Sequence, residues 1–457
     1  MSREIPAGAL HLLPVETREP EYYRLFILSS LALAGLAGLV LGVHIPVGRL
    51  LHWSSEARRP DIIQVHGQVQ LLGFAGLFVM GMSLRMMPRF ANTHLRFEGL
   101  IAPVWGLILA SLATRAFVMV WLPDGPHSLL AIWTQFCLLL AGAGYLLIVF
   151  GTLLIDTRPL EGTAWFFLAG STFFLLQAAL GTLIAIDEAA DDTRVVSYVP
   201  NMAVLYLQIG FLLSFIAGVA TRALPTMSGI PRPEAGAKRV AALLSASVLL
   251  VALPLVWLEY QRYSSGVARL SDLGLIGLGL SLVAIVALSG VMRPVRDRTR
   301  PASQPHMRLV RLSFAWLLFG SVEAVYFGSR ALVEGGLPSF YNLDAFRHTL
   351  ALGGVTALIM GMALMIVPEF AGERRGANRQ AAMSTGLLVA LGAATILRVG
   401  PALLAGNLGP DVRNTSMAVA GVLAEFAVLY FAASFVRLLM AARRDALPLR
   451  PSGIQTS

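Results

Sequence analysis

The chain has 457 residues, of which 56% are hydrophobic and 13% are charged, with a mean hydropathy of +0.71 and a net charge of +9. Because soluble domains carry about 25% charged residues, this composition excludes soluble α/β and all-β folds and predicts a polytopic membrane protein. The single cysteine, Cys137, excludes an intramolecular disulfide framework and any cysteine-based zinc or iron–sulfur cluster. The arginines lie between apolar stretches rather than along one stripe, so no nucleic-acid partner is expected.

Residues 1–22 are polar and show no cleavable signal peptide, so we expect them to form a short tail. Twelve apolar stretches follow, each long enough to cross about 30 Å of hydrocarbon. They are expected near 23–44, 66–88, 99–122, 128–153, 163–186, 200–224, 238–258, 270–293, 308–333, 346–368, 380–404 and 415–440. The sequence thus predicts an all-α fold with a single membrane domain over 23–440 and a second tail over 441–457.

Basic residues set the expected orientation in the membrane. They gather after span six and between spans eight and nine, at Arg232, Lys238, Arg239, Arg293, Arg296, Arg298, Arg300, Arg308 and Arg311. Cytoplasmic loops carry an excess of Lys and Arg, so both termini are expected in the cytoplasm. The expected location is a bacterial-type inner membrane, where membrane lipid is the surrounding partner. Arg58 and Arg59 disagree, because this orientation puts them outside.

One pattern of glycine and proline recurs in three spans. The three copies are Gly73-x7-Gly81-x6-Pro88 in span two, Gly210-x7-Gly218-x6-Pro225 in span six and Gly353-x7-Gly361-x6-Pro368 in span ten. The offsets of 137 and 143 residues each correspond to about four spans. We therefore predict three pseudo-symmetric four-helix units, over about 23–153, 163–293 and 308–440, with spans two, six and ten on the inside.

Two of the eight histidines occupy matched positions in these spans. His66 lies 22 residues before Pro88 and His348 lies 20 residues before Pro368, about 33 and 30 Å at 1.5 Å per residue. Two imidazoles at one depth on separate helices suit the two axial positions of a six-coordinate haem iron. Glycines after each histidine, such as Gly67 and Gly354, are expected to leave room for a flat macrocycle. The alternative is that each histidine is an interfacial residue.

The other six histidines are not expected to take part in such a site. His44 closes span one, and the rest are expected in loops or tails: His11, His52, His94, His127 and His306.

Span ten resembles the tenth helix of subunit I of the haem–copper oxidase superfamily. The resemblance rests on Arg347-His348-x5-Gly354-x4-Ile359-Met360-Gly361-x6-Pro368. It implies twelve helices in three arcs, and one low-spin haem b held by His66 and His348 near the outer face. The sequence departs from that superfamily at Phe346, where a ligand of the high-spin haem is expected. No histidine occurs between His127 and His306, so the copper site of helices six and seven is not expected either.

The chain is also similar to the NnrS family, membrane proteins linked to nitric oxide tolerance and described as binding haem. The similarity lies in Arg347-His348-x-Leu350-x2-Gly353 and in His66-x6-Gly73-x7-Gly81-x6-Pro88. Two features of that family are missing. The His-x-His-Glu that opens its second helix is Gln64-Val65-His66-Gly67 here, and Glu369 and Phe370 stand where a further histidine follows its tenth helix.

Four arginines are predicted toward the outer side, namely Arg330, Arg347, Arg398 and Arg413. Haem carries two propionates, and buried anions need cationic partners. One or two of these arginines are therefore candidates for binding the propionates, and Arg413 is expected in the loop before span twelve. The alternative is that they are interfacial residues whose charged ends reach toward the headgroups.

Glu323 and Glu425 are predicted near the middle of the membrane, where a carboxylate is costly and tends to be paired or to carry protons. Because Glu323 and Arg330 are seven residues apart on one helix face, we expect them to form an ion pair. The methionines of spans two and ten are interpreted as packing residues rather than copper ligands. Copper is not expected.

These features favour a haem b-binding membrane protein that acts in electron transfer or in the response to nitric oxide or redox stress. Six-coordinate haem passes one electron but has no open iron position, which argues against terminal oxidase activity. Without a fused cytochrome domain or a Cys-x-x-Cys-His motif, electrons would come from quinol or a cytochrome. The alternative is a cofactor-free transporter or non-catalytic partner subunit on the same scaffold, since fold alone does not determine function.

Overall fold

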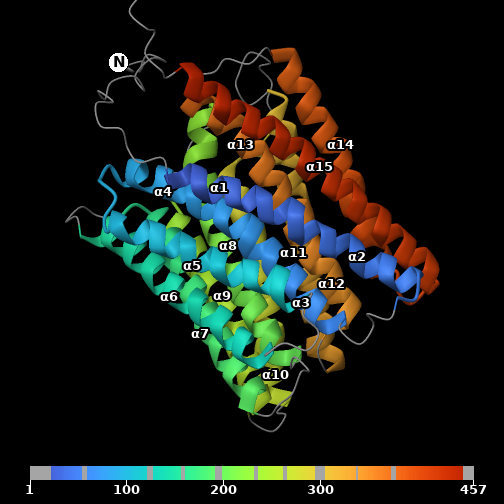
Figure 1. Ribbon diagram of the computed structural model, residues 1–457. Coiled ribbons are helices and arrows are strands. Elements are labelled where there is room, and N and C mark those ends of the chain that lie inside the picture. Colours follow the sequence, from blue (N-terminus) through green and yellow to red (C-terminus); the bar gives the residue numbers. More distant parts are fainter. Residues whose placement is uncertain are drawn as a thin grey trace, which may run out of the picture.

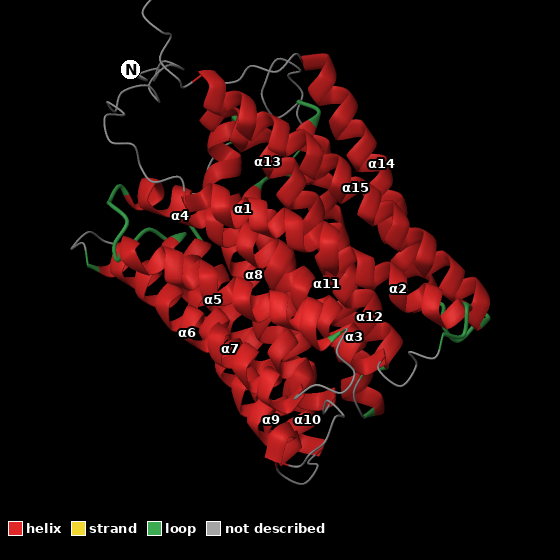
Figure 2. Ribbon diagram, viewed as in Figure 1, coloured by secondary structure: helices red, strands yellow, loops and turns green. Residues whose placement is uncertain are grey.

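The computed structural model describes residues 22–53, 59–120, 127–155, 160–190, 198–230, 235–260, 265–293, 304–335, 338–371 and 377–445. Within these ranges the chain is helical and contains no strand (Figure 2). Twelve of its helices are long and apolar enough to cross a membrane. The prediction of an all-α, multi-pass membrane protein with twelve spans is confirmed.

Eight spans are continuous α-helices: α6 (His127–Leu154), α7 (Ala164–Ala190), α8 (Tyr198–Ser228), α9 (Ala237–Tyr260), α10 (Ser265–Ser289), α11 (His306–Glu334), α14 (Ala377–Leu403) and α15 (Pro410–Asp445). The other four contain a π-helical segment. Span one consists of α1 (Tyr22–Leu33), η2 (Ala34–Gly38) and α2 (Leu39–Leu50), and span two of α3 (Arg59–Gln68), η4 (Val69–Gly76) and α4 (Leu77–Ala91). Span three consists of η5 (Glu98–Leu100), α5 (Ile101–Ala113) and η6 (Thr114–Met119), and span ten of α12 (Phe340–His348), η8 (Thr349–Thr356) and α13 (Ala357–Ala371).

Spans two, six and ten form the centre of the bundle. Within the described residues, 89%, 83% and 89% of their apolar windows are buried, against at most 61% in any other span. The remaining spans surround them, and successive neighbours pack together: α5 with α6, α6 with α7, α9 with α10, α10 with α11, α14 with α15 and α15 with α2. Figure 1 shows α3 and α12 at one end of the bundle and α4 and α13 toward the other.

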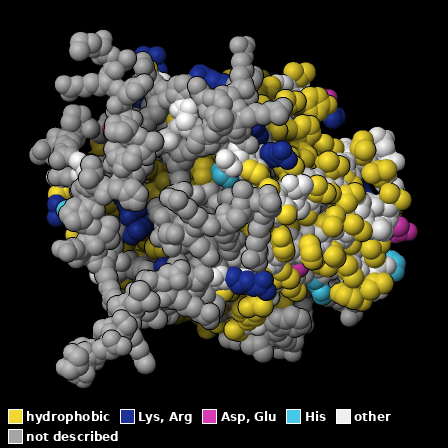
Figure 3. Space-filling view, turned by 90° about the horizontal axis from the view of Figure 1, so that it is seen from above, with side chains coloured by type: hydrophobic (Ala, Val, Ile, Leu, Met, Phe, Trp, Pro, Cys, Tyr) yellow, Lys and Arg dark blue, Asp and Glu magenta, His cyan; other side chains and the backbone are white. Residues whose placement is uncertain are grey.

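The outward surface of the surrounding spans is apolar, as contact with lipid requires. Hydrophobic side chains cover the right-hand side of Figure 3, where α14 and α15 lie. The exposed large hydrophobic residues of these two helices include Val389, Ile396, Val419, Val422, Phe426 and Leu429.

The first glycine of each recurring pattern lies where an inner span meets its two chain neighbours. A Cβ atom at Gly73 would lie 3.2 Å from Leu33 of span one and 3.4 Å from Leu112 of span three. At Gly210 it would meet Phe173 of span five and Val248 of span seven, and at Gly353 it would meet Trp316 of span nine and Thr395 of span eleven. Each inner span thus uses a glycine for close packing against the spans before and after it.

The second glycine makes an equally regular contact. A Cβ atom at Gly81 would lie 2.8 Å from Cβ of Phe26 in span one. At Gly218 it would meet Phe166 and Phe167 in span five, and at Gly361 it would meet Val310 in span nine. These matched contacts are what three related units require, although the internal symmetry itself stays a prediction.

Several span boundaries differ from the predicted ones. Span ten begins at Phe340 instead of 346, because Ser339 caps the helix by accepting a hydrogen bond from the backbone N–H of Asn342 at 3.2 Å. His348 therefore lies about two turns inside the helix rather than at its first turn. Span one likewise continues beyond His44 to Leu50.

Three further residues predicted in loops lie in helices. His127 and His306 are the first residues of α6 and α11, and Arg413 lies in the first turn of α15. Polar residues in the terminal turns of these spans extend the helices beyond their apolar runs, which is why hydropathy alone placed the boundaries too far inward.

Candidate functional site

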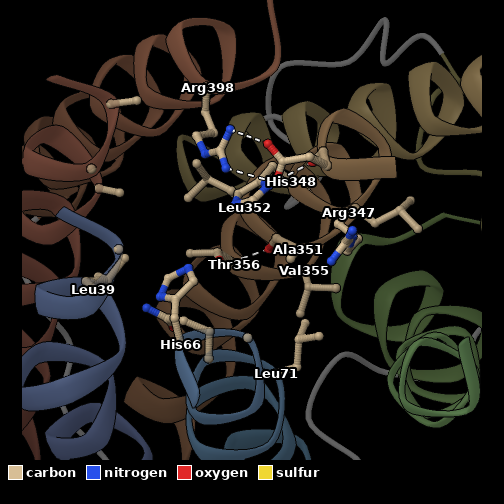
Figure 4. Close-up of a pocket in the computed structure, with 18 of the residues that line it drawn as sticks. Leu39, His66, Leu71, Arg347, His348, Ala351, Leu352, Val355, Thr356 and Arg398 are labelled. Carbon is tan, nitrogen blue, oxygen red and sulfur yellow. Dashed lines mark hydrogen bonds and ion pairs between the residues drawn. The ribbon is translucent and has the colours of Figure 1, made fainter. Parts of the chain in front are cut away.

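A cavity of about 190 Å³ lies at the α3/α12 end of the bundle. Both His66 and His348 line it (Figure 4). Its walls come from spans one, two, six, ten, eleven and twelve and are mostly apolar. The polar side chains among the lining residues are Arg49, His66, Gln70, Tyr341, Asp344, Arg347, His348, Thr356 and Arg398.

His66 is held by span one. Its Nδ1 lies 2.6 Å from the backbone oxygen of Gly38, at the end of η2. A carbonyl oxygen only accepts, so Nδ1 carries the proton and donates it, which leaves the Nε2 lone pair available as a ligand. Gly42 makes room for the ring, since a Cβ there would lie 2.7 Å from Cε1 of His66.

His348 is held in the same way from within its own helix. Its Nδ1 lies 2.8 Å from the backbone oxygen of Asp344 and 3.3 Å from Oδ1 of the same residue. Donation to these oxygens again leaves Nε2 as the free ring nitrogen. Hydrogen bonds of this kind fix the orientation and tautomer of metal-binding histidines.

Asp344 also pairs with Arg398 from span eleven. Arg398 Nη1 lies 2.7 Å from Oδ2 of Asp344, and Nη2 donates to Oδ1 at 2.9 Å. This two-pronged pair links spans ten and eleven beside His348, and Figure 4 shows Arg398 and His348 together on one side of the cavity with His66 on another. Arg398 therefore has an anionic partner within the protein.

The other predicted arginines differ in their distance from the cavity. Arg347 lines it and donates through Nε to the Leu343 oxygen at 3.2 Å, while its buried Nη2 has no hydrogen-bond partner among the described residues. Arg413 is not among the lining residues. It lies over the ring of Tyr341, which does line the cavity, and its Cζ is 4.6 Å from the ring centroid.

Arg330 lies away from the cavity. It is half-exposed and its Nε donates to Glu334 at 2.7 Å, so the predicted ion pair with Glu323 is wrong. The reason is geometric: residues four apart on a helix are neighbours, whereas residues seven apart are separated by two turns. Glu323 is buried instead beside the hydroxyl of Thr349.

Glu425, the second carboxylate predicted near mid-membrane, packs against span one. One of its oxygens would lie 3.8 Å from a Cβ at Gly35, within η2. Neither this residue nor Glu323 is among the residues that line the cavity.

The predicted room for a macrocycle comes from only one of the glycines named for it. Gly67 lines the cavity and has open space where a Cβ would stand. Gly354, in contrast, packs against Leu317 at 2.9 Å from the position of its Cβ, so it serves helix packing. Phe346 is buried, and an apolar ring therefore occupies the position two residues before His348.

Three π-helical segments surround the two histidines. η4 begins three residues after His66, η8 begins directly after His348, and η2 supplies the carbonyl that binds His66. In η8 the hydroxyl of Thr356 donates to the oxygen of Ala351 at 2.9 Å, five residues earlier, which supports the wide turn. Such segments recur at functional sites, because they rotate the following side chains relative to a regular helix.

Sequence reasoning missed five polar residues of the cavity, namely Asp344, Arg49 and Gln70 together with Tyr341 and Thr356. Asp344 was detectable, since it precedes His348 by one helical turn, but the predicted span began after it. Arg49 and Gln70 line the cavity without any such signal. No group of three or more His, Cys, Asp or Glu residues suited to a metal ion occurs among the described residues.

Comparison with models of known protein families finds no match, and comparison with curated proteins finds none either.

Proposed function

We propose that this protein is a haem b-binding membrane protein in which His66 and His348 are the two axial ligands. The observation that carries the proposal is that both imidazoles line one cavity and that each uses Nδ1 to bond a protein oxygen, which leaves Nε2 for iron. The resemblance of spans two and ten to the haem–copper oxidase superfamily and to the NnrS family supports the same ligand pair.

The surroundings of the histidines also suit a haem. An apolar wall favours the macrocycle. Nη2 of Arg347, which has no hydrogen-bond partner among the described residues, is a donor for a propionate. Arg413, which lies over the ring of the lining residue Tyr341, adds positive charge near the cavity. The cavity is smaller than the roughly 300–1,000 Å³ of typical small-molecule sites, so haem binding requires some of the side chains that line it to move.

Bound between two imidazoles, haem supplies reversible one-electron chemistry. The protein's part is to hold the ligand rings, exclude water with the apolar wall and balance the propionate charge. We therefore assign the chain to electron transfer or to the response to nitric oxide or redox stress, with quinol or a cytochrome as the electron donor. We also propose a bacterial-type inner membrane location with both termini in the cytoplasm, because the basic residues gather in the loops on that side.

The reduced-minus-oxidised optical spectrum of the purified protein tests this proposal. Wild type should show one non-covalent low-spin haem b per chain, and His66→Ala and His348→Ala should each lose that low-spin signal, because each removes one strong-field ligand. His44→Ala and His94→Ala are matched controls, since neither residue lines the cavity.

Two outcomes would contradict the proposal. An unchanged low-spin signal in both His66→Ala and His348→Ala would show that the ligand pair is wrong. Wild type without haem, purified from haem-sufficient cells and unable to take up added haem, would favour the cofactor-free transporter or partner subunit.

A further inference from the structure

A second, smaller pocket lies among the three inner spans. Its volume is about 50 Å³, and all twelve of its lining residues are apolar. They come from α4, α8 and α13 alone: Phe78, Val79, Met82, Phe215, Ile216, Val219, Ala220, Leu358, Ile359, Met362, Ala363 and Ile366. Eleven of them are buried, and Val219 is half-buried.

This pocket lies within one helical turn of the large cavity along each inner span. In span two the cavity ends at Ala75 and the pocket begins at Phe78. In span six the last cavity residue is Leu213 and the first pocket residue is Phe215. In span ten the cavity ends at Thr356 and the pocket begins at Leu358. The two spaces share no lining residue among those described, so the pocket is a separate site next to the cavity.

The chemistry of the pocket excludes a stable water molecule. A buried water needs two to four polar partners, and the pocket offers no polar side chain. The backbone groups there are bonded within the three helices. At about 50 Å³ the pocket exceeds the roughly 10–15 Å³ that one water requires, but it is too small for a lipid chain or a cofactor. Its walls lose dispersion contacts as long as no atom fills it.

We propose that this pocket binds a small apolar gas, of the size of xenon or a diatomic molecule. Such ligands gain dispersion contacts without needing a hydrogen bond, and apolar cavities in proteins bind xenon for this reason. Its position beside the large cavity makes it a store for a diatomic gas next to the proposed haem, whose iron the gas could reach only after one of the two histidines leaves it. That role rests on the proposed function, whereas gas binding itself does not.

Xenon is the probe that tests the site. Crystals of the full-length protein pressurised with xenon should show an anomalous difference peak between Met82, Ile216 and Leu358. Ala363→Leu fills the pocket from α13 and should reduce the peak to the noise level. Ala220→Leu fills it from α8 and gives a second test if the first variant fails to fold. Ala32→Leu, the same change at an exposed position of α1, should leave the peak unchanged.

The outcomes separate this inference from the proposed function. A peak in wild type that disappears in either filled variant supports the gas site, whether or not the protein carries haem. No peak in wild type, or a peak that persists in every filled variant that folds, would overturn it. Xenon bound in a protein that cannot bind haem would leave the gas site standing and contradict only the haem assignment.

Discussion

Asp344 contacts two cationic or potentially cationic side chains at once. Its carboxylate accepts from Arg398 and lies 3.3 Å from Nδ1 of His348, and its backbone oxygen bonds the same ring. Because the aspartate and the arginine are both largely buried, each depends on the other for charge balance. The pair therefore supports both the orientation of His348 and the contact between spans ten and eleven.

We predict that Asp344→Asn weakens haem binding and destabilises the protein. Loss of the carboxylate leaves Arg398 buried without its anion, which costs about 3–5 kcal/mol, and loss of a supporting partner typically lowers metal affinity about 10–100-fold. Haem titration and thermal unfolding in detergent measure the two effects. Glu334→Gln, which removes the exposed partner of Arg330, is the control and should change neither. Equal effects of the two substitutions would contradict the assigned role of Asp344.

Arg347 provides a test of the charge around the cavity. A nearby cation would favour reduction of the proposed haem, because reduction adds an electron. Arg347→Gln should therefore lower the reduction potential, by an energy on the order of 1–2 kcal/mol for charges about 10 Å apart at an effective dielectric constant of 20. A spectroelectrochemical titration measures it, with Arg330→Gln as the control outside the cavity. If the reduction potential falls equally in both variants, Arg347 does not lie closer to the haem than Arg330 does.

At the scale of the elements, span one provides the support for His66. Its π-helical segment supplies the Gly38 oxygen, and the next turn supplies the space at Gly42. Gly38 also accommodates Gln70, since a Cβ there would lie 2.8 Å from the amide of that side chain. The glycines of span one therefore shape the cavity as well as the packing of the helices.

We predict that Gly42→Ala disturbs the orientation of His66 and the proposed haem site, whereas Gly106→Ala is tolerated. The added methyl group at Gly42 would lie 2.7 Å from the ring, so the ring or the helix must move, at a cost of about 1–3 kcal/mol. At Gly106, in α5 and outside the cavity, nothing lies within 4 Å of the new atom. The low-spin absorption band and the haem content of both variants are the measurements. Normal haem content and spectrum in Gly42→Ala would show that this close contact has no effect on the ligand.

At the scale of the whole molecule, twelve spans place the loop after α4 and the loop between α14 and α15 on opposite sides of the membrane. His94 and Asn407 are exposed residues of these two loops. The chain's one cysteine, Cys137, is buried, so cysteines introduced elsewhere can be labelled selectively.

We predict that, in a Cys137→Ser background, Asn407→Cys reacts with an impermeant maleimide on intact cells and His94→Cys reacts only after permeabilisation. The reason is the excess of basic residues in the loops assigned to the cytoplasm. Labelling in the reverse pattern would invert the proposed orientation and place His66 and His348 near the cytoplasmic face. Labelling of both positions from outside would contradict an odd number of spans between them.

The sequence by itself determined the membrane fold and its inner helices. A span must bury about 20 apolar residues to cross the hydrocarbon, so hydropathy was sufficient to locate all twelve. The recurring glycines marked spans two, six and ten, because only small residues let helices approach closely in lipid. The positions of His66 and His348 within these spans likewise predicted that they lie at the same end of the bundle, and both line one cavity.

Only the tertiary structure decided which polar residues surround the histidines. Arg398 reaches Asp344 across 54 positions in the sequence, and Gly38 reaches His66 across 28. Such contacts depend on the rotation of each span about its axis, which the π-helical segments change and which hydropathy does not record. Arg330 illustrates the same point. It was predicted on the outer side like Arg347, yet it lies outside the cavity and pairs with Glu334 on its own helix.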